Sequence, residues 1–181
     1  MNNKKSMLIN ILFRVMEFLP VFVFLTLVKI ASDNWRLVFL ITALVSVLVL
    51  VIFEVNRIII NRLTFGIIMY FLAALIVNFS SYASLNRLFE MLQGLGMITV
   101  ILIISPMFIL FSSSGFIGIE NIGKSRNLVF SIILYIVVLI IGVYMYLSRF
   151  YFNLSPLLTE IVPFVVLFTV HGFLRGLATR V

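Results

Sequence analysis

The sequence contains no cysteine, one histidine and one aspartate, and only 10% of its residues are charged. Without cysteine the chain forms no disulfide, carries no thiolate nucleophile and offers no Cys-ligated metal site. The single histidine, His171, excludes a metal site built on two imidazoles. A phosphate-cradling glycine loop and a G-x-S-x-G elbow are also missing. We therefore expect no enzymatic activity, no catalytic residue, no metal and no cofactor.

Apolar side chains are abundant: 64% of the 181 residues are hydrophobic, and the mean hydropathy is +1.29. A soluble domain of this composition would have too little polar surface to face water. The apolar runs are continuous and do not alternate with period two, which favours membrane-spanning helices over a β-barrel. We expect an all-α, polytopic transmembrane bundle in which residues 1–181 form one integral-membrane domain.

Six runs approach the roughly 20 residues that a spanning helix needs. They cover residues 11–30, 37–55, 63–79, 88–111, 128–147 and 156–174. Lys4 and Lys5 precede the first run, as in a signal peptide. However, Arg14 and Glu17 interrupt that run, and Lys29 stands where a small residue should precede a cleavage site, so we expect a retained helix.

The basic residues divide unequally between the two ends of these six helices. Because cationic segments stay on the cytoplasmic side during insertion, the richer end predicts cytoplasmic N- and C-termini. The pI of about 10.2 then reflects contact with anionic lipid headgroups and not with nucleic acid, because the charges border the spans. The richer end carries Lys4, Lys5, Arg14, Arg57, Arg62, Lys124, Arg126, Arg175 and Arg180, and the other end carries Lys29, Arg36, Arg87 and Arg149.

A few polar residues at or inside the spans are candidates for a polar path or a ligand site, since such residues are costly in a bilayer. Glu17 follows Arg14 at a spacing that allows an ion pair on one helix face. Glu90 is placed to complement the dipole at the start of the fourth run. Gln93 begins a polar, small-residue segment with Gly94 that suits either a site or close helix packing.

The sixth run carries the most suggestive pattern. Ser155 and Pro156 are typical of an N-cap and a first helical turn. Glu160, His171 and Arg175 then share one helical stripe, which predicts a polar path hidden from lipid. The alternative is a helix with polar ends, in which the last two side chains reach the headgroups.

Prolines inside three of the runs add an architectural prediction. Pro20, Pro106 and Pro163 each remove a helical hydrogen bond, so the first, fourth and sixth helices should be kinked or locally opened. Helices one to three and four to six then form halves of opposite topology, an arrangement that some transporters use around a midplane site.

Several short motifs resemble the small inner-membrane proteins related to intracellular septation protein A. The similarity runs in order along most of the chain. The motifs are Asn10-Ile11-Leu12-Phe13, Leu19-Pro20-Val21 with Lys29, Asn61-Arg62-Leu63, Ile104-Ser105-Pro106, Leu154-Ser155-Pro156-Leu157-Leu158, and the closing Arg175 and Arg180. The resemblance implies a bacterial inner-membrane protein of five or six helices, associated with septation and envelope maintenance, for which it implies no established reaction.

Three functional hypotheses follow. In the first, the protein is a non-enzymatic membrane component that binds lipids and other envelope proteins or further copies of itself. In the second, it is a small carrier that binds a solute or lipid within the bundle, with the stripe on residues 156–174 as part of the site. In the third, it is a small immunity protein against a membrane-active peptide, which its size and basic charge allow.

Overall fold

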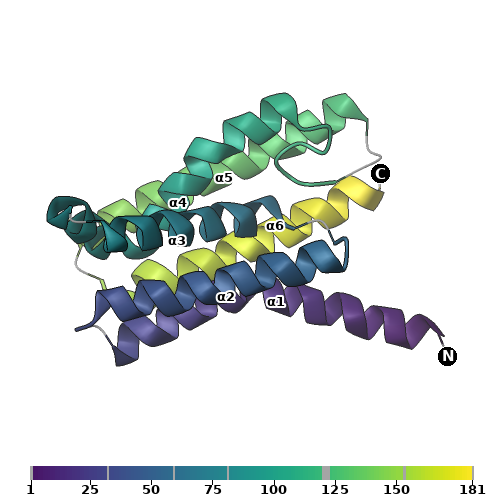
Figure 1. Cartoon of the computed structure of the whole chain (residues 1–181). Coiled ribbons are helices and arrows are strands. Elements are labelled where there is room, and N and C mark those ends of the chain that lie inside the picture. The colour runs from purple at the N-terminus through teal and green to yellow at the C-terminus, as the bar shows by residue number, and fades with distance from the viewer. Residues whose placement is uncertain are drawn as a thin grey trace. The chain divides into compact units, whose positions relative to one another are not determined.

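The computed structural model describes residues 2–31, 33–58, 60–80, 82–119, 123–152 and 154–180, and it describes the side chains of these residues except 2–12, 14 and 180. Every regular element in these ranges is helical, as the composition predicted (Figure 1). The helices are α1 (Asn2–Ile30), α2 (Trp35–Val55), α3 (Arg62–Phe79), α4 (Ala83–Phe111), α5 (Lys124–Phe150), the π-helical segment η1 (Leu157–Ile161) and α6 (Val162–Arg180).

Five helical segments are long and apolar enough to cross a membrane. They correspond to five of the six predicted spans, and three of them extend well beyond the predicted ends because helices continue into the polar flanks. Helix α1 covers the remaining predicted span, residues 11–30, but is not among the five, so a sixth span stays a prediction. The five segments are Trp35–Val55, Arg62–Phe79, Ala83–Phe111, Lys124–Phe150 and Leu157–Thr179.

Asparagine side chains start two of the helices at the predicted boundaries. The Leu37 amide donates to Asn34 Oδ1 at 3.2 Å, and the Leu63 amide donates to Asn61 Oδ1 at 3.0 Å. Each bond satisfies one of the amides that a helix leaves free in its first turn. The polar links between the apolar runs therefore fix where α2 and α3 begin.

The chain divides into two compact units, Met1–Met91 and Leu92–Val181. In the first unit, α1 packs on α2, and α3 packs on both. Phe24, Phe39, Tyr70 and Phe71 are almost fully buried there, and their rings contact one another. Phe89, in the first part of α4, stacks on Tyr70 with ring centroids 5.3 Å apart. This aromatic cluster joins the start of α4 to the first unit.

In the second unit, α5 packs against both α6 and η1. The later part of α4 contacts α5 at Gly142, where an added Cβ would lie 3.2 Å from Ile98 Cγ2. The buried face of α5 recurs at helical spacing, as expected for a helix that is covered on one side only. That face consists of Asn127, Ser131, Leu134, Val138, Ile141, Gly142, Met145 and Ser148.

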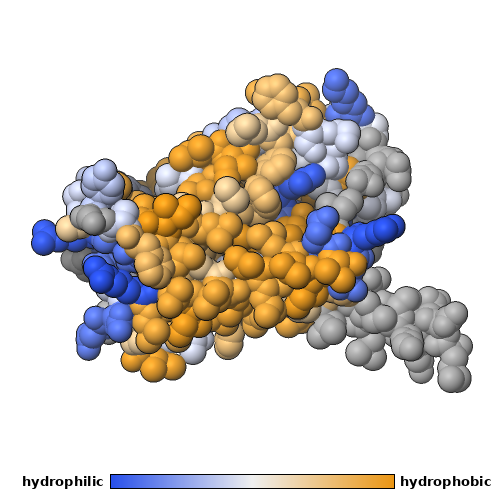
Figure 2. Space-filling view, in the orientation of Figure 1, coloured by the Kyte–Doolittle hydropathy of each residue, from blue (hydrophilic) through white to orange (hydrophobic). Residues whose placement is uncertain are grey.

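The opposite face of α5 is apolar and exposed. Val129 and Val143 are each 51% exposed, and Ile140 is 60% exposed. Figure 2 shows a broad apolar surface with hydrophilic side chains gathered toward the ends of the helices. Because the outward faces of these long helices are apolar, the pattern is that of helices surrounded by lipid. The protein is a multi-pass membrane protein.

The proline predictions had different outcomes in the three helices. Helices α1 and α4 continue through Pro20 and Pro106, and the non-helical backbone of α4 is at Gln93 instead. Near Pro163 the chain does depart from regular α-helix, because η1 ends just before it. Pro163 cannot donate to the carbonyl of Thr159, so a wider helical turn before the proline costs little.

Candidate functional site

The central feature of the second unit is a break in α4. Gln93 has φ 46° and ψ −122°, a conformation that residues with a side chain rarely adopt. The amides that follow Gln93 cannot all reach the carbonyls four residues earlier, so residues 94–111 begin a new helical segment with free amides. At 1.5 Å per residue this segment is about 27 Å long, close to the thickness of a bilayer core.

Glu160 satisfies the first of these amides. The Gly94 amide donates to Glu160 Oε2 at 2.9 Å, and the carboxylate is nearly buried, with the residue 5% exposed. The positive end of a helix dipole favours a negative charge at this position. The carboxylate of η1 thus completes the N-terminal end of the second part of α4.

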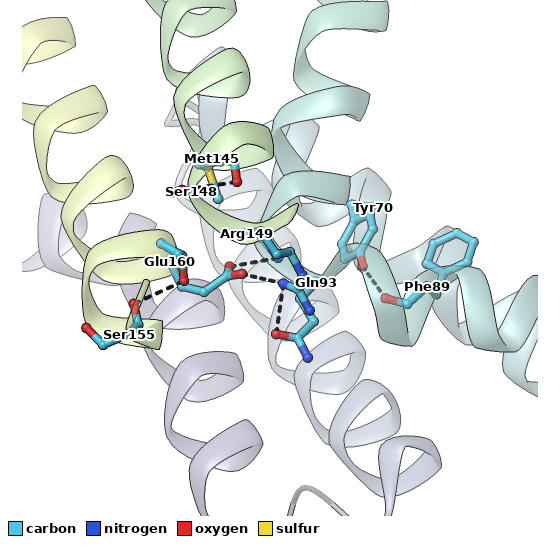
Figure 3. A network of polar contacts seen from close by, with 10 residues as sticks. Tyr70, Phe89, Gln93, Met145, Ser148, Arg149, Ser155 and Glu160 are labelled. Atoms are coloured by element: carbon cyan, nitrogen blue, oxygen red, sulfur yellow. Dashed lines mark hydrogen bonds and ion pairs between the residues drawn. The ribbon is translucent and has the colours of Figure 1, made fainter. Parts of the chain in front are cut away.

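Arg149, in the last turn of α5, neutralises the same carboxylate. Its Nη1 donates to Glu160 Oε1 at 2.7 Å and to Gln93 Oε1 at 3.3 Å (Figure 3). Charge-assisted bonds of this kind are stronger than neutral ones. The cluster of Gln93, Gly94, Arg149 and Glu160, called the ion-pair cluster below, therefore joins α4, α5 and η1 by polar contacts.

The sequence predicts Gln93 and Glu160 as candidate site residues and Gly94 as part of a polar, small-residue segment, whereas Arg149 counts only among the cations at one end of the helices. The sequence nevertheless contains a signal for the pair of Arg149 and Glu160. Arg149 and Glu160 are opposite charges on the two sides of a short connection between apolar runs. Antiparallel helices joined by a short loop bring such residues together.

Gly94 is where the carboxylate comes closest to the backbone. A Cβ built at this position would collide with Glu160 Oε2, and it would lie 3.1 Å from the terminal carbon of Met145. Both Glu160 and Met145 are buried. Glycine is therefore required here by space and not by backbone conformation.

The π-helical segment η1 sets the position of Glu160. Its amide pattern is one residue wider than that of an α-helix, since the Val162 amide donates to the carbonyl of Leu157. The Ser155 carbonyl accepts from the amides of Leu158 and Thr159 at 2.9 and 3.0 Å, which agrees with the predicted start of this helix. The widened turn lies directly before Pro163 and carries Glu160 on its buried side.

A second polar cluster lies in the same unit, where residues 112–119 fold back along α5. The amides of Phe116 and Ile117 donate to Ser131 Oγ at 3.0 and 3.2 Å. Ser131 is seven residues into α5, so the loop returns by about 10 Å along the helix. Asn127 Nδ2 donates to the carbonyl of Ser113 at 2.8 Å. These contacts satisfy the non-helical backbone inside the unit.

Gly115 allows this return. Its φ is +58°, and a Cβ would lie 2.5 Å from Ser131 Oγ and 2.6 Å from Asn127 Oδ1. Both the backbone conformation and the close approach therefore favour glycine. Sequence reasoning missed this loop, although the run Ser112-Ser113-Ser114-Gly115 is typical of a turn.

The predicted stripe on the last helix separates into different environments. Glu160 belongs to the ion-pair cluster, and His171 is 4% exposed, with Nε2 3.3 Å from the carbonyl of Ile117 in the returning loop. Arg175 is exposed, which agrees with a side chain that reaches the headgroups and not with a hidden polar path. Glu160 and His171 are buried and Arg175 is not, and a polar path through the two buried side chains stays a prediction.

The remaining predicted site residues lie in the first unit. Glu17 Oε1 accepts from the amide of Asn61 at 3.3 Å, at the start of α3. The side chain of Arg14 lies outside the described residues, so the predicted pair with Glu17 stays a prediction. Glu90 is well past the first turn of α4, which starts at Ala83, so the dipole interpretation of Glu90 is wrong. The helix simply begins earlier than its apolar run.

The geometry of the ion-pair cluster is that of a closed structural contact. Both carboxylate oxygens of Glu160 bond to groups of the chain itself, and the residue beside them has no room for a side chain. Among the described residues no three His, Asp or Glu side chains gather as a metal site would require. Comparisons with protein-family models, with curated proteins and with solved structures find no match. The resemblance to the septation protein A family stays a prediction.

Proposed function

We propose that this protein is a non-enzymatic component of the bacterial inner membrane that acts through contacts with other envelope proteins. One observation carries the proposal: the two buried ionisable side chains described in the second unit, Glu160 and His171, both bond to other groups of the chain. Glu160 is held by Arg149 and the Gly94 amide, and His171 lies against the loop carbonyl of Ile117. Groups engaged in this way stabilise the fold and are not displayed to a substrate. The outward-facing surface of the helices is therefore the part of the protein that is available for contacts with partners.

The resemblance to the septation protein A family supports an envelope role, and the distribution of basic residues supports cytoplasmic termini. The envelope role and the cytoplasmic termini are therefore both parts of what we propose. The role predicts that the polar clusters matter for folding and that function survives their conservative replacement.

A complementation experiment tests this proposal. The gene is deleted, and the envelope and division phenotype is restored with wild type, Glu160→Gln and His171→Gln at matched membrane levels. We expect both variants to restore at least about half of the wild-type effect at matched membrane levels. The amide of Glu160→Gln keeps one acceptor oxygen, for Arg149 or for the Gly94 amide, and the lost second bond should lower stability and not function. Complete loss of function at normal membrane levels would contradict the proposal.

A carrier function is the second candidate, and a specific observation favours it. A helix interrupted near a buried charge, as α4 is at Gln93 beside Glu160, also occurs in secondary transporters, where half-helix ends bind substrate or ions. In a carrier the Glu160 carboxylate must exchange its partners during transport.

The carrier candidate has its own test. Reconstituted protein is screened for solute flux and for ligand-induced thermal stabilisation, and Glu160→Gln is compared with wild type. A carrier would lose its response in the variant. A response that is identical in both proteins would remove Glu160 from any transport path.

A further inference from the structure

One end of the second unit combines exposed cations with an apolar flank. Lys124 and Arg175 are exposed, and Arg126 is half-buried. The folded-back loop brings them to the same end, because Asn127 of α5 and His171 of α6 both bond to it. Among the described side chains none of these three cations forms an ion pair, in contrast to Arg149.

The charge balance of this end is strongly positive. The second unit contains two acidic residues in sequence, Glu120 and Glu160, and the latter is paired with Arg149. The other four cations of this unit, Lys124, Arg126, Arg175 and Arg180, therefore outnumber its one remaining acidic residue in sequence. An excess of this size attracts an anion even if Glu120 is fully charged.

The position of two of these cations is itself informative. Lys124 and Arg126 occupy the first turn of α5, and this turn contains no acidic residue. Cations in a first turn oppose the helix dipole and are unfavourable there. A nearby anion from outside the chain would reverse that cost, since it interacts favourably with the two side chains and with the dipole.

The adjoining surface of α5 suits acyl chains. Leu128, Val129 and Ile132 follow the cations by about one to two turns and are 44%, 51% and 42% exposed. A ligand that bridges both surfaces carries a negative group at one end and long apolar chains at the other. Phospholipids with an anionic headgroup have this arrangement.

We propose that Lys124, Arg126 and Arg175 form a binding site for the phosphate of an anionic phospholipid whose acyl chains lie along the exposed face of α5. The lipid site requires that the protein is inserted in a membrane, but it does not require the proposed envelope role. The lipid site and the envelope role can therefore be contradicted independently. The site also assigns this end of the second unit to the leaflet that is richer in anionic lipid.

Native mass spectrometry of the full chain tests the site. The protein is released from lipid nanodiscs that contain equal amounts of phosphatidylglycerol and phosphatidylethanolamine, and the retained lipids are counted. Wild type should retain phosphatidylglycerol preferentially. The K124Q/R126Q/R175Q variant should lose that lipid by about tenfold, because each cation near the surface contributes appreciably. Retention unchanged from wild type would overturn the proposal.

Two further variants control for net charge and folding. K29Q/R36Q/R87Q removes three exposed cations from the first unit and should retain the lipid. K124R/R126K/R175K keeps the charges of the site and should retain the lipid as well. An equal loss in the first control would show a general charge effect and overturn the site.

Free phosphate is the alternative source of the same chemistry. Millimolar glycerol 3-phosphate is added to wild-type protein before release. The bound phospholipid should remain, because its acyl chains contribute to binding through burial of apolar surface. Displacement of the lipid by the soluble phosphate would overturn a lipid site in favour of a simple anion site.

Discussion

Arg149 and Glu160 form an ion pair with 2.7 Å between Nη1 and Oε1, across the connection between α5 and η1. The pair differs from a surface salt bridge in its surroundings, because the Glu160 side chain is only 7% exposed and that of Arg149 24%. The same carboxylate completes the broken helix α4 at Gly94. The consecutive elements α5 and η1 and the distant break in α4 thus depend on one buried charge.

The losses of stability from removing each partner of this pair should not add. Arg149→Leu and Glu160→Leu should each lower the free energy of unfolding by about 3 kcal/mol, because each leaves an unpaired charge in a poorly solvated place. The double variant should lose less than the sum of the two single losses. Reversible unfolding in mixed micelles by sodium dodecyl sulfate measures this, with the exposed Glu54→Gln as a control that should change stability by less than about 0.5 kcal/mol. Strictly additive losses would show that the two side chains do not interact.

Gly94 should tolerate no side chain. Gly94→Ala should destabilise the protein by about 2 kcal/mol, because its Cβ would collide with Glu160 Oε2 in a packed site. Gly172 is the matched control, since a Cβ there meets nothing within 4 Å. Gly172→Ala should be neutral or stabilising by up to about 1 kcal/mol through its higher helix propensity. Thermal unfolding of both variants in the same detergent tests this; a neutral Gly94→Ala would contradict the close contact.

Gln93 should show an inverted order of helix propensity. In an ordinary helix alanine is more stable than glycine by about 1 kcal/mol. At Gln93, with φ 46°, glycine avoids strain that alanine retains, and both substitutions lose the bond from Arg149. Gln93→Gly should therefore be more stable than Gln93→Ala by about 1 to 2 kcal/mol, measured by the same unfolding assay. If Gln93→Ala were instead more stable than Gln93→Gly, α4 would be continuous at this residue.

The returning loop should open when its acceptor is removed. Ser131 Oγ accepts two loop amides, so Ser131→Ala leaves the amides of Phe116 and Ile117 without this partner and should cost about 2 kcal/mol. Hydrogen exchange of these two amides should become at least about tenfold faster, while amides in the middle of α5 stay protected. Ser125→Ala, on the exposed surface, is the control. Unchanged exchange of the Phe116 and Ile117 amides in Ser131→Ala would show that the loop does not bond to Ser131.

The helices were predictable because each signal is local. Continuous apolar runs predicted six spans, and five of them correspond to helical segments long and apolar enough to cross a membrane. The ends were less accurate where a helix continues into polar sequence, as α4 does before Glu90. Hydropathy alone carries no information on such extensions.

The ion-pair cluster was only partly predictable. Glu160 and Gln93 stood out as polar residues in apolar surroundings, which is a local property. The backbone of Gln93 was not predictable, because the break is completed by Glu160, 66 residues after Gly94. The role of Arg149 was not predictable from its position alone, because cations are common at helix ends and its partner lies across the connection to η1.

Native mass spectrometry of the protein extracted gently from its own membrane tests the central proposal most directly. The account predicts that another envelope protein is released with this chain in fixed stoichiometry, and that Glu160→Gln retains the same complex because Glu160 acts inside the fold. Release of the chain alone with one defined small solute, lost in Glu160→Gln, would contradict the account and establish a carrier.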